Sequence, residues 1–211
     1  MGKKTSSIFQ NKQLEGVFVP LIEKVATKYS VIINQLGDDR AEQVQYNRFI
    51  NNGKVTPSRL IDHYWEKART SVAGKDVLVI SDTSTLSFTP DKQREFLGYI
   101  GKDTKKEGFD IHPSILVDAQ DGGCYGLGGM TTYRNLKPPQ ARVNGEKKVR
   151  STAYADKPFT ENERYKWYGS PEQSIKNCSG AASYTLVGDR ESDIYELIAM
   201  TLERKWEFLY R

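Results

Sequence analysis

The sequence is poor in cysteine, has no long apolar run and carries no strong excess of charge of one sign. Its two cysteines, Cys124 and Cys178, have no ligand-like spacing. Neither a disulfide framework nor a zinc site is therefore expected, and a reducing cytoplasm fits. No apolar stretch approaches membrane-spanning length and no signal peptide is visible, so we expect no membrane partner. The net charge of +4 is mildly basic and supports an acidic partner only weakly.

Hydrophobic residues, in contrast, are as frequent as a folded core requires. They make up 37% of the 211 residues, and aromatic residues make up 11%, which is unlike a disordered chain. We expect one principal core with a small N-terminal region. The helical region is expected over residues 1–73, and a core of α+β or α/β class over residues 74–211.

The N-terminal region shows three helical patterns. Apolar residues over 14–29 recur with the helical period, a second helix is expected over residues 40–51, and Thr56 followed by Pro57 is typical of the start of a third. These helices could form a plain subdomain with solvated charges or a surface that binds DNA phosphates. The basic residues concerned are Lys24, Lys28, Arg40, Arg48, Lys54 and Arg59.

Two apolar strands end in an aspartate. Residues 77–80 are four consecutive apolar residues, typical of a strand buried on both faces, and they lead through Ser81 to Asp82. Residues 184–187 lead in the same way to Asp189 and then into a helix with an apolar face. Each aspartate either caps local backbone amides or is held at the rim of the sheet, where both could bind a divalent cation.

The remaining pattern predicts a mixed sheet with inserted helices. A helix through Lys166 and Trp167 is expected to break or restart at Pro171. A turn at Asp121-Gly122-Gly123 predicts that the strands on either side of it pair antiparallel. The further strands are expected over residues 85–88, 109–119, 124–133 and 206–210.

Taken together and in order, these segments resemble the DDE transposases, and most closely the bacterial "insertion sequence four" group, which includes the transposon-five enzyme. Residues 81–88 and 188–194 resemble the first and second catalytic-aspartate motifs of that family. The resemblance covers residues 11–211. The other matches are residues 46–52 with 55–57, which resemble the "YRF…N…V" block, Lys166-Trp167, which resembles the basic-tryptophan pair, and residues 208–211, which resemble the strand after the second aspartate.

The resemblance implies an N-terminal helical domain that binds double-stranded DNA at transposon ends, followed by an incomplete ribonuclease H-like mixed sheet. It also implies cut-and-paste DNA transposition, in which metal-dependent phosphodiester cleavage is followed by strand transfer. Asp82 would bridge two Mg²⁺ or Mn²⁺ ions and Asp189 would bind one of them. A homodimer belongs to the full-length family, and we do not extend it to this chain.

Residues 134–158 combine two adjacent prolines with many basic side chains, which predicts a long exposed loop. Such a loop beside a carboxylate site could follow a nucleic-acid backbone, and a solvated loop explains it equally well. Arg190 could contact phosphate or form a surface ion pair with Asp193 or Glu191. The predicted DNA-binding residues are Arg48, Lys147, Lys148, Arg150, Arg190 and Arg211.

The family pattern also requires a third carboxylate, a glutamate within Tyr-x-x-Arg-x-x-x-Glu-x-x-x-x-x-Lys on a later helix, and we find no such block. Glu191, Glu196 and Glu203 lie too soon after Asp189 to match it. We therefore expect the truncated N-terminal part of a transposase, inactive alone. Two alternatives are a small ribonuclease H-like nuclease, with Glu191 or Asp193 as third ligand, and a non-enzymatic DNA-binding protein or regulator.

Overall fold

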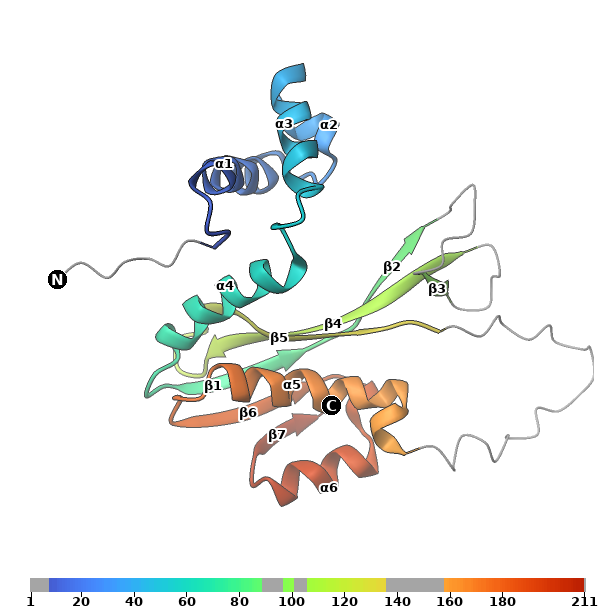
Figure 1. Cartoon of the computed structure of the whole chain (residues 1–211). Helices are drawn as coiled ribbons and strands as arrows, with labels where there is room; N and C mark the ends of the chain where they lie inside the picture. The colour runs from blue at the N-terminus through green and yellow to red at the C-terminus, as the bar shows by residue number, and fades with distance from the viewer. Residues whose placement is uncertain (1–7, 89–96, 101–105, 136–157, 211) are drawn as a thin grey trace, which may run out of the picture. The chain divides into compact units, whose positions relative to one another are not determined.

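The computed structural model describes residues 8–88, 97–100, 106–135 and 158–210. The chain divides into two compact units, Met1–Tyr64 and Trp65–Arg211 (Figure 1). The division falls inside a helix, whereas the sequence pattern placed the boundary after residue 73. Each unit has its own hydrophobic core, and each is described separately below.

The first unit is helical. It contains α1 (Lys12–Lys28), α2 (Ile33–Leu36), α3 (Arg40–Ile50) and the start of α4 (Pro57–Ser71). The side chain of Asn11 caps α1 and that of Asp39 caps α3, each by accepting backbone N–H groups of the first turn. The three long helices begin close to where the apolar period and the cap residues predicted. The core of the unit is formed by Phe9, Leu14, Phe18, Leu21, Leu36, Tyr46 and Phe49.

The described residues of the second unit form a seven-stranded mixed sheet, which makes the fold α+β. Strand β1 pairs antiparallel with β4, and β4 pairs antiparallel with β5. On its other side β1 pairs parallel with β6, which pairs parallel with β7. This order is the ribonuclease H-like order that the resemblance implied. The strands are β1 (Asp76–Ser81), β2 (Ser84–Phe88), β3 (Gly98–Tyr99), β4 (Glu107–Asp118), β5 (Cys124–Tyr133), β6 (Ser183–Gly188) and β7 (Glu207–Tyr210).

Strands β1 and β2 behave as one long strand with a short gap. Both pair with the same side of β4, and the register continues across the gap, because Ser81 lies opposite Ser114 and Ser84 lies opposite Ile111. The gap itself consists of Asp82 and Thr83. The residue of β4 that faces Asp82 in this register is a proline, which has no N–H to donate to a ladder.

Helix α5 (Lys166–Asn177) packs against β5, β4 and β1 (Figure 1). Two 3₁₀ turns, Phe159–Glu161 and Glu163–Tyr165, precede it. The expected break at Pro171 was wrong, because the helix runs through this residue without interruption. The packing of α5 against the sheet stabilises the helix by more than it loses through the one backbone hydrogen bond that Pro171 cannot donate.

The buried core of the second unit has two parts. Val77 and Val79 lie with Ala68, Val72, Leu116 and Cys178 in one cluster, while Trp167, Tyr168, Ile194 and Leu197 form the other. The prediction that residues 77–80 are buried on both faces was wrong in part. Leu78 and Ile80 alternate with the buried valines and stay partly exposed. The described helices therefore cover only one face of β1 completely.

Candidate functional site

The structure brings Asp82 and Asp189 to the same edge of the sheet. In the parallel pair of β1 and β6, Ile80 lies opposite Val187. Asp82 and Asp189 each follow two residues later, so they occupy equivalent positions at the carboxyl ends of neighbouring strands. Both side chains are exposed. Within the described part of the chain, neither carboxylate takes part in an ion pair, so both charges face solvent.

Each carboxylate is also fixed by a local hydrogen bond. The backbone N–H of Thr83 donates to Oδ1 of Asp82 at 2.7 Å, and that of Glu191 donates to Oδ1 of Asp189 at 2.9 Å. Both aspartates therefore cap local backbone amides and also lie at the edge of the sheet. Asp189 caps a 3₁₀ turn, η4 (Arg190–Ser192), rather than the long helix that we expected, because α6 (Tyr195–Glu203) begins only afterwards.

A buried histidine lies beside this edge. His112 on β4 is 2% exposed, its Nδ1 is 2.9 Å from Oγ1 of Thr83, and its ring meets that of Trp167 edge to face with centroids 4.5 Å apart. The pKa of His112 is lowered to about 4, mainly by burial and also by the charge of Lys166, while Asp82 and Asp189 oppose the shift. All three charged groups thus lie within electrostatic reach of one imidazole.

Our sequence analysis did not single out His112. The available signal was a histidine inside a predicted strand, in a chain that contains only two histidines. Alone, this signal is weak, because a strand histidine is as easily an ordinary core residue. Only the pairing of β4 with β1 and β2 reveals that it faces the gap after Asp82.

Lys166 is the second buried polar residue of the site, with its side chain only 8% exposed. Its Nζ lies 3.3 Å from Oε1 of Glu163 and 3.9 Å from Oε2 of Glu191. Lys166 is the first residue of α5, and Glu191 belongs to the turn that follows Asp189. The lysine therefore ties the start of α5 to the turn that carries the second aspartate.

A buried chain of hydroxyl groups holds α5 close to the sheet. Oγ of Ser114 lies 2.7 Å from Oγ of Ser81 and 2.8 Å from Oγ of Ser170, and all three serines are buried. Ser81 immediately precedes Asp82, while Ser170 belongs to α5. Small side chains at this contact let the helix approach closely, which places Trp167 over His112.

Among the residues that the structure describes, no third carboxylate joins the pair. In the described ranges, no group of three or more His, Cys, Asp or Glu side chains is placed to hold a metal ion, so the structure does not assemble Glu191 or Asp193 with the two aspartates. The two carboxylates are oxygen ligands of the kind that magnesium and manganese take. Magnesium takes oxygen ligands, keeps several waters and is often held by one or two carboxylates together with substrate phosphates.

The basic residues predicted to bind DNA fall into three groups. Arg48 is exposed on α3, and Arg190 is exposed beside Asp189. Arg190 forms no ion pair with the described residues, since Glu191 pairs with Lys166 instead. Lys24 and Lys28, which were possible phosphate contacts, form ion pairs with Asp38 at 2.7 and 2.5 Å. The remaining residues, Lys147, Lys148, Arg150 and Arg211, lie outside the described residues.

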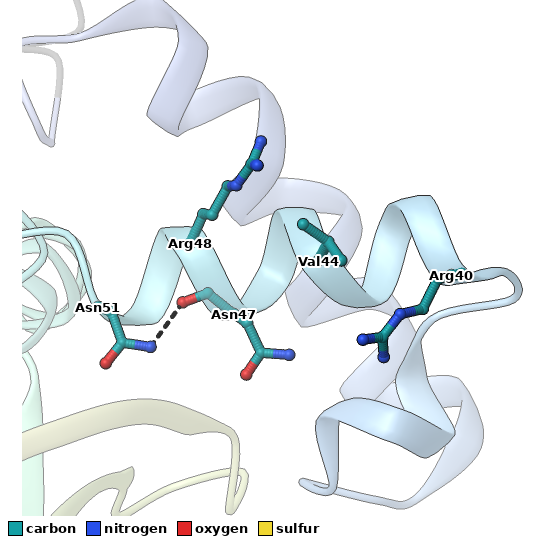
Figure 2. A pocket seen from close by; sticks show the side chains of 5 residues that line it. All are labelled: Arg40, Val44, Asn47, Arg48 and Asn51. Carbon is teal, nitrogen blue, oxygen red and sulfur yellow. Dashed lines mark hydrogen bonds between the residues drawn. The ribbon is translucent and has the colours of Figure 1, made fainter.

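Helix α3 presents a polar, basic face with a hollow in its surface. The residues that line it recur every three or four positions, so they lie on one side of the helix. The side-chain amide of Asn51 donates to the carbonyl oxygen of Asn47 at 2.8 Å (Figure 2). This hollow belongs to the first unit and not to the edge that carries the aspartates. Its lining residues are Arg40, Val44, Asn47, Arg48 and Asn51.

Comparisons with known proteins show a distant likeness to a solved structure. No model of a protein family matches the chain, and no curated protein matches its sequence. Among solved structures, it is similar to a piggyBac transposase in a cryo-EM structure of the synaptic complex with hairpin DNA, at a TM-score of 0.40 and 14% identity. The match covers 100% of this chain and 44% of that one. Among the described helices, none is both long and apolar enough to cross a membrane.

Proposed function

We propose that the chain carries the DNA-processing core of a DDE transposase, similar to the "insertion sequence four" group, with Asp82 and Asp189 as two of its metal-binding carboxylates. The in-register position of these aspartates on neighbouring parallel strands supports the proposal most strongly. Both carboxylates are exposed and neither pairs with a basic side chain of the described residues, so both are available to a cation.

In this proposal, Asp82 and Asp189 hold Mg²⁺ or Mn²⁺ together with waters and a phosphate of DNA. When bound there, the ions would stabilise the attacking and leaving oxygens of phosphodiester cleavage and of the following strand transfer. The protein supplies the fixed geometry: the N–H groups of Thr83 and Glu191 orient the two carboxylates. Arg190, which is exposed and directly follows Asp189, would contact a phosphate.

The DNA surface in this proposal includes the polar face of α3. Arginine and asparagine are the side chains that recognise guanine and adenine by paired hydrogen bonds, and arginine also binds phosphate. Arg40 and Arg48 form no ion pair with any described residue, unlike Lys24 and Lys28. Double-stranded DNA, and transposon ends in particular, is the proposed partner of this face.

A second candidate function is a non-enzymatic DNA-binding protein or regulator. The observation that favours it is that the described residues offer no third ligand beside Asp82 and Asp189. This alternative keeps the basic face of α3 and assigns no cation to the aspartates. It therefore expects DNA binding that depends on salt but is indifferent to magnesium and to Asp82.

Binding of Mn²⁺ to the full chain separates these functions. We expect one or more Mn²⁺ ions to bind. Asp82→Asn and Asp189→Asn should each weaken the binding about 100-fold, because the loss of a ligand should cost at least as much as the loss of a group that only orients a ligand, which is worth up to about 100-fold. Titration calorimetry or the electron paramagnetic resonance signal of free Mn²⁺ measures this. Asp193→Asn is the matched control, because Asp193 is exposed and close in sequence to Asp189.

Affinity that is unchanged in both Asp82→Asn and Asp189→Asn would contradict the metal site and favour the non-enzymatic alternative. We also expect the wild-type chain to bind Mn²⁺ without cutting a transposon-end duplex, because two carboxylates alone leave the ions incompletely held. Cleavage that requires Mn²⁺ and disappears in Asp82→Ala would show that the chain supplies a third ligand.

The face of α3 is tested by the salt dependence of DNA binding. Each protein–phosphate contact contributes about one unit to the slope of log affinity against log salt concentration. We expect Arg48→Ala to reduce this slope by about one unit, and the double variant Arg40→Ala/Arg48→Ala by about two, in fluorescence-anisotropy titrations of a short duplex. Arg69→Ala is the control, because Arg69 is exposed and engaged 2.8 Å from Glu66. If Arg48→Ala and the double variant show the same slope as the wild type, the face of α3 is excluded as a DNA-binding surface.

A further inference from the structure

The gap between β1 and β2 is the point at which Asp82 leaves the sheet, and one side chain of β4 contacts it. Thr83 is the second residue of the gap, and its hydroxyl lies 2.9 Å from Nδ1 of His112. The preceding rung on the same face is the contact between Ser81 and Ser114 at 2.7 Å. Two successive side-chain pairs therefore bridge β4 to the residues on either side of Asp82.

His112 is unusual for a residue that only fills the core. The imidazole is 2% exposed, yet its Nε2 is buried without a hydrogen-bond partner in the described part of the chain. A buried polar atom left unpaired costs stability, and an apolar ring of similar size would fill the same space without that cost. Among the described residues, Thr83 is the only one that forms a hydrogen bond with the ring.

The contacts form a continuous path from helix α5 to the first aspartate. Trp167 packs edge to face on the imidazole with ring centroids 4.5 Å apart and an interplanar angle of 74°, which limits how the ring can turn. The imidazole in turn holds the hydroxyl of Thr83. The backbone N–H of the same threonine donates to Oδ1 of Asp82 at 2.7 Å. A side chain that holds Thr83 in place therefore also holds the orientation of the Asp82 carboxylate.

We propose that His112 is a positioning residue for Asp82: buried beneath Trp167, it anchors Thr83 and so sets the orientation in which the Asp82 carboxylate meets a divalent cation. This inference rests on the proposed function, because it assumes that Asp82 is a metal ligand. His112 itself touches neither the cation nor the DNA. Groups that orient a metal ligand in this way are commonly worth 10- to 100-fold in metal affinity.

The test compares variants that remove the hydrogen bond at nearly unchanged bulk with variants that keep a polar group in its place. Thr83→Val and His112→Phe remove it. Thr83→Ser keeps the hydroxyl, and His112→Asn keeps a polar atom near the place of Nδ1. We expect Thr83→Val and His112→Phe each to weaken Mn²⁺ binding about tenfold, whereas the two conservative variants stay within about threefold of the wild type.

The double variant Thr83→Val/His112→Phe separates positioning from a general loss of structure. If both residues act through one contact, the double variant loses the same tenfold as either single variant, because the second change has nothing left to remove. An additive loss of about 100-fold would mean that the two act independently and would overturn the proposal. Equal affinity of Thr83→Val, His112→Phe and wild type would overturn it as well.

A second readout needs no metal. With only two histidines in the chain, the imidazole nitrogens of His112 can be followed by NMR with His63 as the internal reference. We expect Thr83→Val to shift the Nδ1 resonance of His112 and to leave His63 unchanged. An unchanged Nδ1 resonance would overturn the contact itself.

The reference variant Asp82→Asn distinguishes failure of this inference from failure of the proposed function. Mn²⁺ binding that depends on Asp82 but not on Thr83 or His112 would overturn the positioning role and leave the metal site standing. Mn²⁺ binding that does not depend on Asp82 would overturn both.

Discussion

Replacing Gly129 with alanine is expected to lower the free energy of unfolding of the second unit by about 3 kcal/mol or more, at or above the usual range for overpacked cores. A Cβ atom at this position would lie 2.3 Å from the carbonyl oxygen of Ser170 and 2.7 Å from Oγ of Ser174. The first of these atoms belongs to the backbone of α5, so no change of rotamer can relieve the clash. The helix has to move away from β5.

Urea or thermal unfolding followed by circular dichroism measures this loss. Gly180→Ala is the matched control, because a Cβ atom there meets nothing within 4 Å, and we expect a change within about 0.5 kcal/mol. Stability of Gly129→Ala equal to that of Gly180→Ala would show that α5 does not pack as tightly as described. Since α5 also carries Lys166 and Trp167, the expected displacement would reach the edge that bears Asp82 and Asp189.

The sequence predicted a strand over residues 124–133 but not this close approach of a helix. The structure shows Gly128 as the extra residue of a bulge, since Ser114 pairs with Gly129 and Ile115 pairs with Leu127. Gly128 and Gly129 both lie against α5. The periodicity of apolar residues indicates which residues form strands. It does not indicate which element will pack on a given face of the sheet.

The pair of aspartates was more accessible to sequence reasoning. An apolar run that ends in Asp82 and a second one that ends in Asp189 are local patterns, and parallel pairing of two such strands places both ends at one edge. The pairing of β1 with β6 came from the order of elements that the resemblance implied. What remained hidden was the support of the site by His112, because this side chain reaches Thr83 only through the antiparallel pairing of β4.

The charged residues of the first unit show a similar limit. The sequence alone did not distinguish the six basic residues of this unit as possible phosphate contacts. In the structure, Lys24 and Lys28 lie one helical turn apart on α1, and both form ion pairs with Asp38, just before α3. These ion pairs hold the pKa of Asp38 at about 2, through hydrogen bonds from the two lysines. Arg40 and Arg48 project from another helix and stay exposed. Charged residues in a sequence indicate positions on the surface. Only the folded structure shows which of them already form ion pairs.

Replacing Leu197 with alanine is expected to destabilise the second unit by about 3 kcal/mol, within the range of 2–5 kcal/mol found for buried leucines. Leu197 is fully buried on α6 and belongs to the cluster of Trp167, Tyr168 and Ile194. The variant leaves a cavity between α5 and α6 that neither short helix can easily fill. Chemical unfolding with tryptophan fluorescence follows the loss, because Trp167 lines the same cluster.

The same helix offers a control of identical chemistry. Leu202 is 61% exposed, so Leu202→Ala should change the stability by no more than about 0.5 kcal/mol. Equal effects of the two replacements would mean that α6 is not held by its buried face. A selective effect of Leu197→Ala has a functional consequence, because α6 follows directly on the turn that carries Asp189. The variant should then also bind Mn²⁺ more weakly at temperatures where its fold is still intact, since looser packing of α6 frees the turn that follows Asp189.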